Sequence, residues 1–308
     1  VTATASPPPT DTETAVSPTS TVGKTDGVPV TGPAMKPAAI MPLPTSLIYD
    51  VKSARHAAPY GDSYDLNRLE RPFLQDMKYL PDVDIVSFSI SEDADWYYVS
   101  MQLAGNNPNN QMQIDYGVEL DQNADGYGDT LIWAYPPYST EWTTNWVQVY
   151  TDANHDSAGK SSARADTDAG GNGYETLTFD GKSGQGTDPN LAWVRIQEGP
   201  QALVQFAFKK SLSGAVFLVG VIADAGPRDV AKMDYNDHFK EAEAGSPLKG
   251  TRYYPLKTLF AVDNTCWQAY GMKNPTNIAK VCPASLSASV NPQPSETPAG
   301  TSTATQYP

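Results

Sequence analysis

Apolar and polar residues alternate along most of the central chain, which is the pattern of β-strands with one buried face. Val86, Phe88 and Ile90 alternate with serines, a polar Glu-Asp-Ala-Asp turn follows, and alternate apolar residues resume over 97–103. This period of two predicts a β-hairpin. Further strands are expected at 112–120, 130–135, 145–151, 174–179, 191–197, 202–209, 215–223 and 257–262.

One segment departs from strict alternation. Residues 215–222 are almost continuously apolar, as expected for a central strand that is covered on both faces. Helix is a minor component: a turn or two is expected within 229–239 and a short piece within 66–78. Turn-separated strands of this number predict an all-β fold, an antiparallel β-sandwich of the jelly-roll-like kind.

Both ends of the chain differ in composition from its centre. Residues 1–45 and 285–308 are rich in Pro, Thr and Ser and poor in core-forming residues. Such segments bury too little apolar surface to offset their ordering entropy. We therefore expect an extended stalk at 1–45, a β-sandwich domain at 46–284 and a Ser/Thr/Pro-rich tail at 285–308. The central part, about 240 residues, is long enough for one large β domain.

Charge narrows the range of partners. The formal net charge is −14, which argues against nucleic acid and anionic membranes, since binding to both relies on Lys and Arg. No apolar run approaches the length of a membrane span. The chain starts at Val1, so we expect a product from which a secretion signal has been removed. The expected location is extracellular, secreted or at the cell surface.

The two cysteines, Cys266 and Cys282, lie close together in a stretch rich in Gly, Pro and Asn. We predict one disulfide bond that closes a short loop, in keeping with an oxidising compartment. The alternative is a pair of free, buried thiols.

Residues 121–129 read Asp-Gln-Asn-Ala-Asp-Gly-Tyr-Gly-Asp and place oxygen-bearing side chains at alternate positions. Gly126 permits the sharp turn by which such oxygens converge on a calcium ion. The loop is not an EF-hand, because Ile132 stands where a bidentate Glu belongs and the flanks read as strands. We predict a structural calcium clamp between two strands, the alternative being an acidic hairpin turn without an ion. The candidate ligands are Asp121, Asn123, Asp125, Tyr127 and Asp129.

A second acidic group is formed by Asp152, Asn154 and Asp156, with Asp166 and Asp168 available from farther along the chain. These residues are further candidate calcium ligands, although a solvated loop is favoured here because no Gly marks the turn. A third acidic neighbourhood consists of Asp224, Asp234 and Asp237. There a capping or loop role is expected.

Aromatic residues are concentrated between 133 and 150. Flat rings stack on the C–H faces of sugars, so this cluster predicts a carbohydrate platform, with Glu141, Asn145 and Gln148 near for hydrogen bonding. Of the aromatic residues, Trp142 is expected to be exposed. The alternative is that the rings belong to the core. The candidate ligand-binding residues are Trp133, Tyr135, Tyr138, Trp142 and Trp146.

The hairpin Ser89-Ile-Ser-Glu-Asp-Ala-Asp-Trp-Tyr-Tyr-Val-Ser-Met-Gln-Leu103 and the following Tyr116-Gly-Val-Glu-Leu-Asp121 carry a resemblance. They resemble the early strands of family 9 carbohydrate-binding modules and of the related DOMON sandwiches. The match covers about 50 residues. It implies a β-sandwich that binds sugars in one branch, binds haem in another and is simply structural elsewhere. The chain also resembles uncharacterised secreted bacterial proteins with Pro/Thr-rich leaders, which implies export.

Motifs for catalysis are missing from the sequence: no nucleophile elbow, zinc-protease motif or phosphate loop occurs. Glycoside hydrolysis stays open, because the separation of two carboxylates is a three-dimensional property. We therefore predict a noncatalytic, calcium-binding sandwich that binds polysaccharide or cell-surface glycan. The alternative is a structural subunit of a sheath, filament or surface layer, whose tails contact other copies of the chain.

Overall fold

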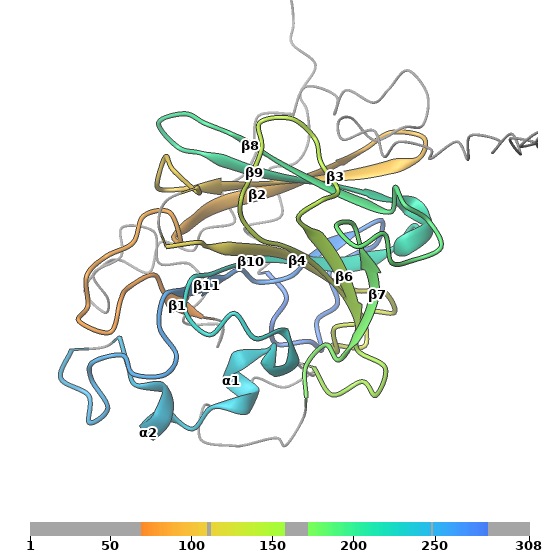
Figure 1. Ribbon diagram of the computed structural model, residues 1–308. Coiled ribbons are helices and arrows are strands. Elements are labelled where there is room, and N and C mark those ends of the chain that lie inside the picture. The colour runs from red at the N-terminus through yellow and green to blue at the C-terminus, as the bar shows by residue number, and fades with distance from the viewer. Residues whose placement is uncertain (1–68, 110–111, 158–171, 248, 283–308) are drawn as a thin grey trace, which may run out of the picture.

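The computed structural model describes residues 69–109, 112–157, 172–247 and 249–282, and these form two antiparallel β-sheets. The large sheet has the order β1-β11-β10-β4-β5-β6-β7, with β12 also paired to β10. The small sheet has the order β2-β3-β9-β8. Figure 1 shows the small sheet stacked on one face of the large sheet, while short helices and loops lie on the other side.

The elements follow one another along the chain with little helix. The strands are β1 (Glu70–Arg71), β2 (Ile85–Glu92), β3 (Trp96–Leu103), β4 (Asp115–Asp121), β5 (Thr130–Ala134), β6 (Val147–Thr151), β7 (Thr176–Asp180), β8 (Ala192–Gln197), β9 (Leu203–Lys209), β10 (Phe217–Asp224), β11 (Val262–Asn264) and β12 (Gln268–Tyr270). The helical pieces are η2 (Lys210–Leu212), η3 (Val230–Lys232), α1 (Tyr235–His238) and α2 (Glu241–Ala244).

The main core lies between the two sheets and is built from alternate residues of each strand. On β4, Tyr116, Val118 and Leu120 point inward, and Val99 and Phe206 meet them from the small sheet. Because side chains alternate across a strand, the intervening residues of β4 must face the other side of the large sheet.

That other side is not open to solvent along its length. Leu131, Trp133 and Ile222 project from β5 and β10 and pack with Tyr235 and Phe239 of the α1 region. The large sheet is thus buried on both faces in its middle, which explains why all eight residues of β10 are buried. A continuous apolar run is the sequence expected for such a strand.

The predicted fold class is confirmed. The predicted hairpin is present as β2 and β3, in which Phe88 lies opposite Met101, and β10 is central as expected. The helical turns expected within 229–239 are present as η3 and α1.

Two local predictions are wrong. The strand expected at 257–262 is instead β11, at Val262–Asn264, because the preceding residues run as turns. The helix expected at 66–78 does not form over its described part, where β1 pairs with β11. The predicted stalk at 1–45 and tail at 285–308 lie outside the described residues.

Candidate functional site

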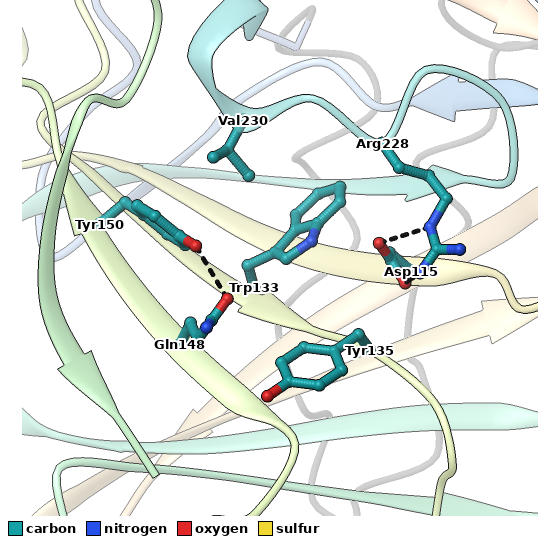
Figure 2. A pocket seen from close by; sticks show the side chains of 7 residues that line it. All are labelled: Asp115, Trp133, Tyr135, Gln148, Tyr150, Arg228 and Val230. Atoms are coloured by element: carbon teal, nitrogen blue, oxygen red, sulfur yellow. Dashed lines mark hydrogen bonds and ion pairs between the residues drawn. The ribbon is translucent and has the colours of Figure 1, made fainter. Parts of the chain in front are cut away.

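An open cavity of about 250 Å³ lies on the outer face of the large sheet, beside the loop that follows β10. Strands β4, β5 and β6 form its floor. In Figure 2, Tyr150 and Gln148 lie at one end of the cavity and an ion pair lies at the other, with aromatic rings between them. The lining residues are Asp115, Trp133, Tyr135, Gln148, Tyr150, Arg228 and Val230.

Strand register brings the floor residues together. Trp133 of β5 is directly opposite Gln148 of β6, and Tyr150 is opposite Leu131. Trp133 is also opposite Gly117 of β4, where a Cβ would come within 2.8 Å of the indole. A glycine at this position therefore leaves the space that the Trp133 ring occupies.

The polar groups at one end of the cavity are held by a short chain of hydrogen bonds. The Tyr150 hydroxyl donates to Gln148 Oε1 at 2.8 Å, and Gln148 Nε2 donates to Asp180 Oδ2 at 3.4 Å. Burial, together with the charge of Asp180, raises the pKa of both Tyr135 and Tyr150. Both phenols are therefore neutral hydrogen-bonding groups at physiological pH.

The other end of the cavity is formed by a bidentate ion pair. Arg228 Nε and Nη2 donate to the two carboxylate oxygens of Asp115, each at 2.7 Å. Burial raises the pKa of Asp115, and the hydrogen bonds from Arg228 oppose that shift. This planar pair fixes the guanidinium, and the Arg228 side chain is still one-third exposed.

Arg228 lies on the loop that follows β10, and a buried carboxylate at the end of β10 holds this loop in place. Asp224, at the end of β10, accepts hydrogen bonds from the backbone N–H groups of Gly226 and Arg228, each at 2.8 Å. The Tyr235 hydroxyl donates a short hydrogen bond to the same carboxylate and accepts one from the Asp229 N–H at 3.0 Å. Burial raises the pKa of Asp224 to about 7.

This arrangement suits a small ring that carries hydroxyl groups. The aromatic faces offer stacking area, while an amide, phenols, a carboxylate and a guanidinium offer directional hydrogen bonds. Among the described lining residues, Asp115 supplies the one carboxylate, and it is already paired with Arg228. Glycoside hydrolysis usually requires two carboxyl groups across the bond that is cleaved.

The predicted aromatic residues separate into three groups. Trp133 and Tyr135 line the cavity, together with Gln148. Trp146 borders it: its ring lies 5.7 Å from that of Tyr135, and Lys182 Nζ lies 4.8 Å from the Trp146 ring. Glu141 and Asn145 are not among the lining residues.

The two remaining predicted residues, Tyr138 and Trp142, are buried. Tyr138 packs in the main core and donates its hydroxyl to the carbonyl oxygens of Ile114 and Ala134. The prediction that Trp142 is exposed is wrong: it is 2% exposed and packs with Trp96 and Trp193 over the small sheet. For both residues the alternative interpretation is therefore correct: the ring belongs to the core.

Sequence reasoning missed Asp115, Arg228 and Val230 as lining residues. Asp115 and Arg228 are 113 residues apart in the chain, and nothing in the local pattern links them. They meet because β4 and β10 are neighbours, with Asp115 directly opposite Asp224.

The loop at 121–129 joins β4 to β5, as predicted. Its oxygens are gathered by backbone N–H groups: Asp121 Oδ2 accepts from Gly126 at 2.8 Å, and Asn123 Oδ1 accepts from Asp125 at 2.9 Å. Asp125 Oδ1 accepts from Tyr127 at 2.9 Å. Gly126 has a φ of 98°, which is the turn expected of it.

Two carboxylates of this loop are largely withdrawn from solvent. Burial, together with the neighbouring charges of Asp129 and Asp125, raises the pKa of Asp121 to about 6. Asp129 Oδ2 accepts the Gln122 N–H at 2.6 Å, and burial raises its pKa. These oxygens could serve a hard cation such as calcium.

The second acidic group lies beside the first. The Asp152 N–H donates to the Asp129 carbonyl at 3.1 Å, and His155 Nδ1 is 3.4 Å from Asp129 Oδ1. Asp152 itself accepts backbone N–H groups from Asn154, His155 and Ser157. Asn154 and Asp156 bond to Asn172 instead of converging with Asp152. The candidate ligands Asp166 and Asp168 lie outside the described residues.

Sequence reasoning also missed a fourth acidic group, which is assembled only by the fold. Glu70, Asp84 and Asp263 are buried and each offers an oxygen within 4.8 Å of the others. Tyr79 donates to Asp84 Oδ2 at 2.5 Å, and the Ile85 N–H donates to Asp263 Oδ2 at 2.7 Å. This triad could hold a metal ion.

The predicted disulfide is confirmed. Cys266 and Cys282 are joined at an S–S distance of 2.06 Å and close a loop with a sequence separation of 16. Closing a loop of that length stabilises a fold by about 3 kcal/mol.

Comparison with known proteins identifies no relative. No family model matches the chain, and neither a curated protein nor a solved structure matches it. Within the described residues, no helix has the length and apolar character needed to cross a membrane. The fold and the site define the protein as an antiparallel β-sandwich with an aromatic, polar-rimmed cavity.

Proposed function

We propose that this protein is a noncatalytic carbohydrate-binding module whose cavity takes a single sugar ring. The observation that carries the proposal is the cavity itself, in which Trp133, Tyr135 and Tyr150 surround Gln148 and face the Asp115–Arg228 pair. Its volume of about 250 Å³ is below the range of drug-sized pockets and suits one ring of a glycan. The resemblance of the hairpin 89–103 and the segment 116–121 to family 9 modules supports the same class.

The proposed location is extracellular. A disulfide bond in a domain of this kind is typical of an oxidising compartment, and Cys266–Cys282 is such a bond. Polysaccharide and cell-surface glycan are the ligands that this location offers.

The test is a single substitution in the cavity. Tyr135→Ala removes one aromatic face and is expected to weaken binding by about 1 kcal/mol, or roughly fivefold in Kd. Binding is measured by titration with the oligosaccharide that the wild type retains best on a glycan array.

The matched control is Tyr254→Ala, since Tyr254 is an exposed tyrosine outside the cavity and its loss should leave Kd unchanged. If the wild-type protein retains no glycan on the array, the proposal is wrong. Equal losses for the two variants would place the binding elsewhere.

We propose further that calcium is held by the 121–129 loop. Its support is the set of oxygen-bearing side chains on one hairpin and the turn at Gly126. At a calcium concentration of 100 times Kd, binding stabilises the folded state by about 2.7 kcal/mol. Adding a chelator to the calcium-loaded protein is therefore expected to lower Tm, which differential scanning calorimetry measures.

Asp129→Asn should remove this calcium-dependent shift, whereas Asp76→Asn should keep it. Asp76 is a suitable control because it also accepts a backbone N–H, from Lys78, but lies in a different turn. A shift that survives Asp129→Asn would place the ion at another acidic group, such as the Glu70–Asp84–Asp263 triad. The absence of any shift would exclude calcium as a stabilising ligand.

A further inference from the structure

The buried side chain of Lys280 lies against two buried carboxylates. Lys280 Nζ is 2.7 Å from Asp234 Oδ2 and 3.5 Å from Asp237 Oδ2. The exposed fractions of the three side chains are 0% for Lys280, 1% for Asp234 and 2% for Asp237. An amine, a carboxyl group and a second carboxylate thus meet in a site that is buried from bulk solvent.

Each partner is held in place by its own backbone. Asp234 is at the N-cap position of α1, yet its side chain makes no capping hydrogen bond and is directed to Lys280 instead. The Lys280 carbonyl accepts the Trp267 N–H at 2.9 Å, next to the Cys266–Cys282 disulfide. The reacting groups are therefore fixed in contact before any reaction, which lowers the entropic barrier to joining them.

We propose that Lys280 Nζ and Asp234 Cγ form an intramolecular isopeptide bond, with Asp237 as the acid–base catalyst. The proposal does not depend on the sugar-binding cavity. It assigns a covalent cross-link between the N-terminus of α1 and the segment around the Cys266–Cys282 disulfide.

The reaction balances without an oxidant or an external reagent. A proton passes from the Lys280 ammonium to the Asp234 carboxylate, which leaves a neutral amine and a carboxylic acid. The amine attacks Asp234 Cγ, and Asp237 moves one proton from the nitrogen to the departing hydroxyl group. The Cγ–O bond breaks, one water leaves, and Asp237 is again a carboxylate.

Burial favours each stage of this sequence. Burial away from bulk water makes it costly to hold three charged groups together, and forming the amide removes two of those charges. Loss of the product water from the site then opposes hydrolysis of the new amide. An ordinary ion pair in the same place would retain both charges at a desolvation cost.

The test is the mass of the intact, reduced full-length protein. We expect a mass lower than that of the sequence by one water, and a branched proteolytic peptide that joins the segments containing residues 234 and 280. Lys280→Arg keeps the positive charge but cannot form the amide, and should have the full sequence mass. Asp237→Asn should accumulate the unlinked form.

The control is Lys257→Arg, because Lys257 is exposed and donates to the Ala242 carbonyl, so its loss should not affect the cross-link. Wild-type protein with the full sequence mass and only linear peptides overturns the proposal. Loss of water without the branched peptide, as from a succinimide at Asp125–Gly126, overturns it as well. The peptide map of the wild type decides the question even if the variants fail to fold.

Discussion

Raising the pH from about 4 to about 7 is expected to destabilise the folded protein by about 3 kcal/mol through Asp224 alone. Burial raises the pKa of this carboxyl to about 7 in the folded state, against an ordinary value of 3.8. The folded state therefore binds the proton more tightly than the unfolded state does. This contribution is fully present below the unfolded pKa and is lost as the pH rises through the folded pKa.

Other carboxyl groups also change how the free energy of unfolding depends on pH. Burial also raises the pKa of Asp115, which adds to the effect. For Asp180, hydrogen bonds from Lys182, Ser183 and Gln148 outweigh burial and lower the pKa, which opposes the effect. Asp224 has the largest of these shifts because it lies under the loop without access to water.

The measurement is the free energy of unfolding in urea at pH values between 4 and 7. A chelator is present throughout, because a cation at the 121–129 loop would displace protons from that loop. Asp224→Asn should remove the largest part of the pH dependence and leave the smaller part due to Asp121 and Asp115, and the Asp76→Asn control should retain all of it. Stability that increases with pH over this range would contradict the assignment.

Trp142→Ala is expected to lower the free energy of unfolding by about 3–5 kcal/mol, the usual cost of removing a buried large aromatic ring. The Trp142 ring packs with Trp96, Tyr98 and Trp193, and the Arg195 guanidinium lies 5.0 Å above it. Its removal would leave a cavity that the strands of the small sheet cannot close.

We expect Trp142→Ala to lower stability without changing glycan affinity, and Tyr135→Ala to lower glycan affinity. Trp142→Ala should leave the Kd for glycan unchanged in the folded protein, because the ring is not among the residues that line the cavity. Trp142→Phe should recover most of the lost stability, since it refills much of the volume. A loss of affinity with intact stability would restore Trp142 as a ligand-binding residue.

The candidate site could be predicted only where its residues are neighbours on one hairpin. Trp133, Tyr135 and Gln148 come from β5, β6 and the turn between them, so local aromatic density indicated them. The local density of aromatic residues could not distinguish the rings that line the cavity from the rings that lie in the core. Tyr138 and Trp142 stand in similar sequence surroundings, but the small sheet and the main core cover them.

Long-range contacts could not be predicted for a physical reason. Arg228 meets Asp115, Lys280 meets Asp234, and Glu70 meets Asp263, because strand order and loop paths bring them together. The spacing of these residues along the chain does not predict the order of the strands in the sheets. Boundaries at 257–262 were misplaced because turn residues and a short strand share the same local composition.

The sequence by itself determined the fold class, the central β10 strand, the hairpin that presents the 121–129 loop, and the disulfide pairing of the only two cysteines. These features depend on local periodicity, turn chemistry and residue count, all of which can be read along the chain. Only the tertiary structure decided which aromatic rings face the cavity and which carboxylates are buried. Those properties depend on what packs over each residue, and the covering segments come from distant parts of the chain.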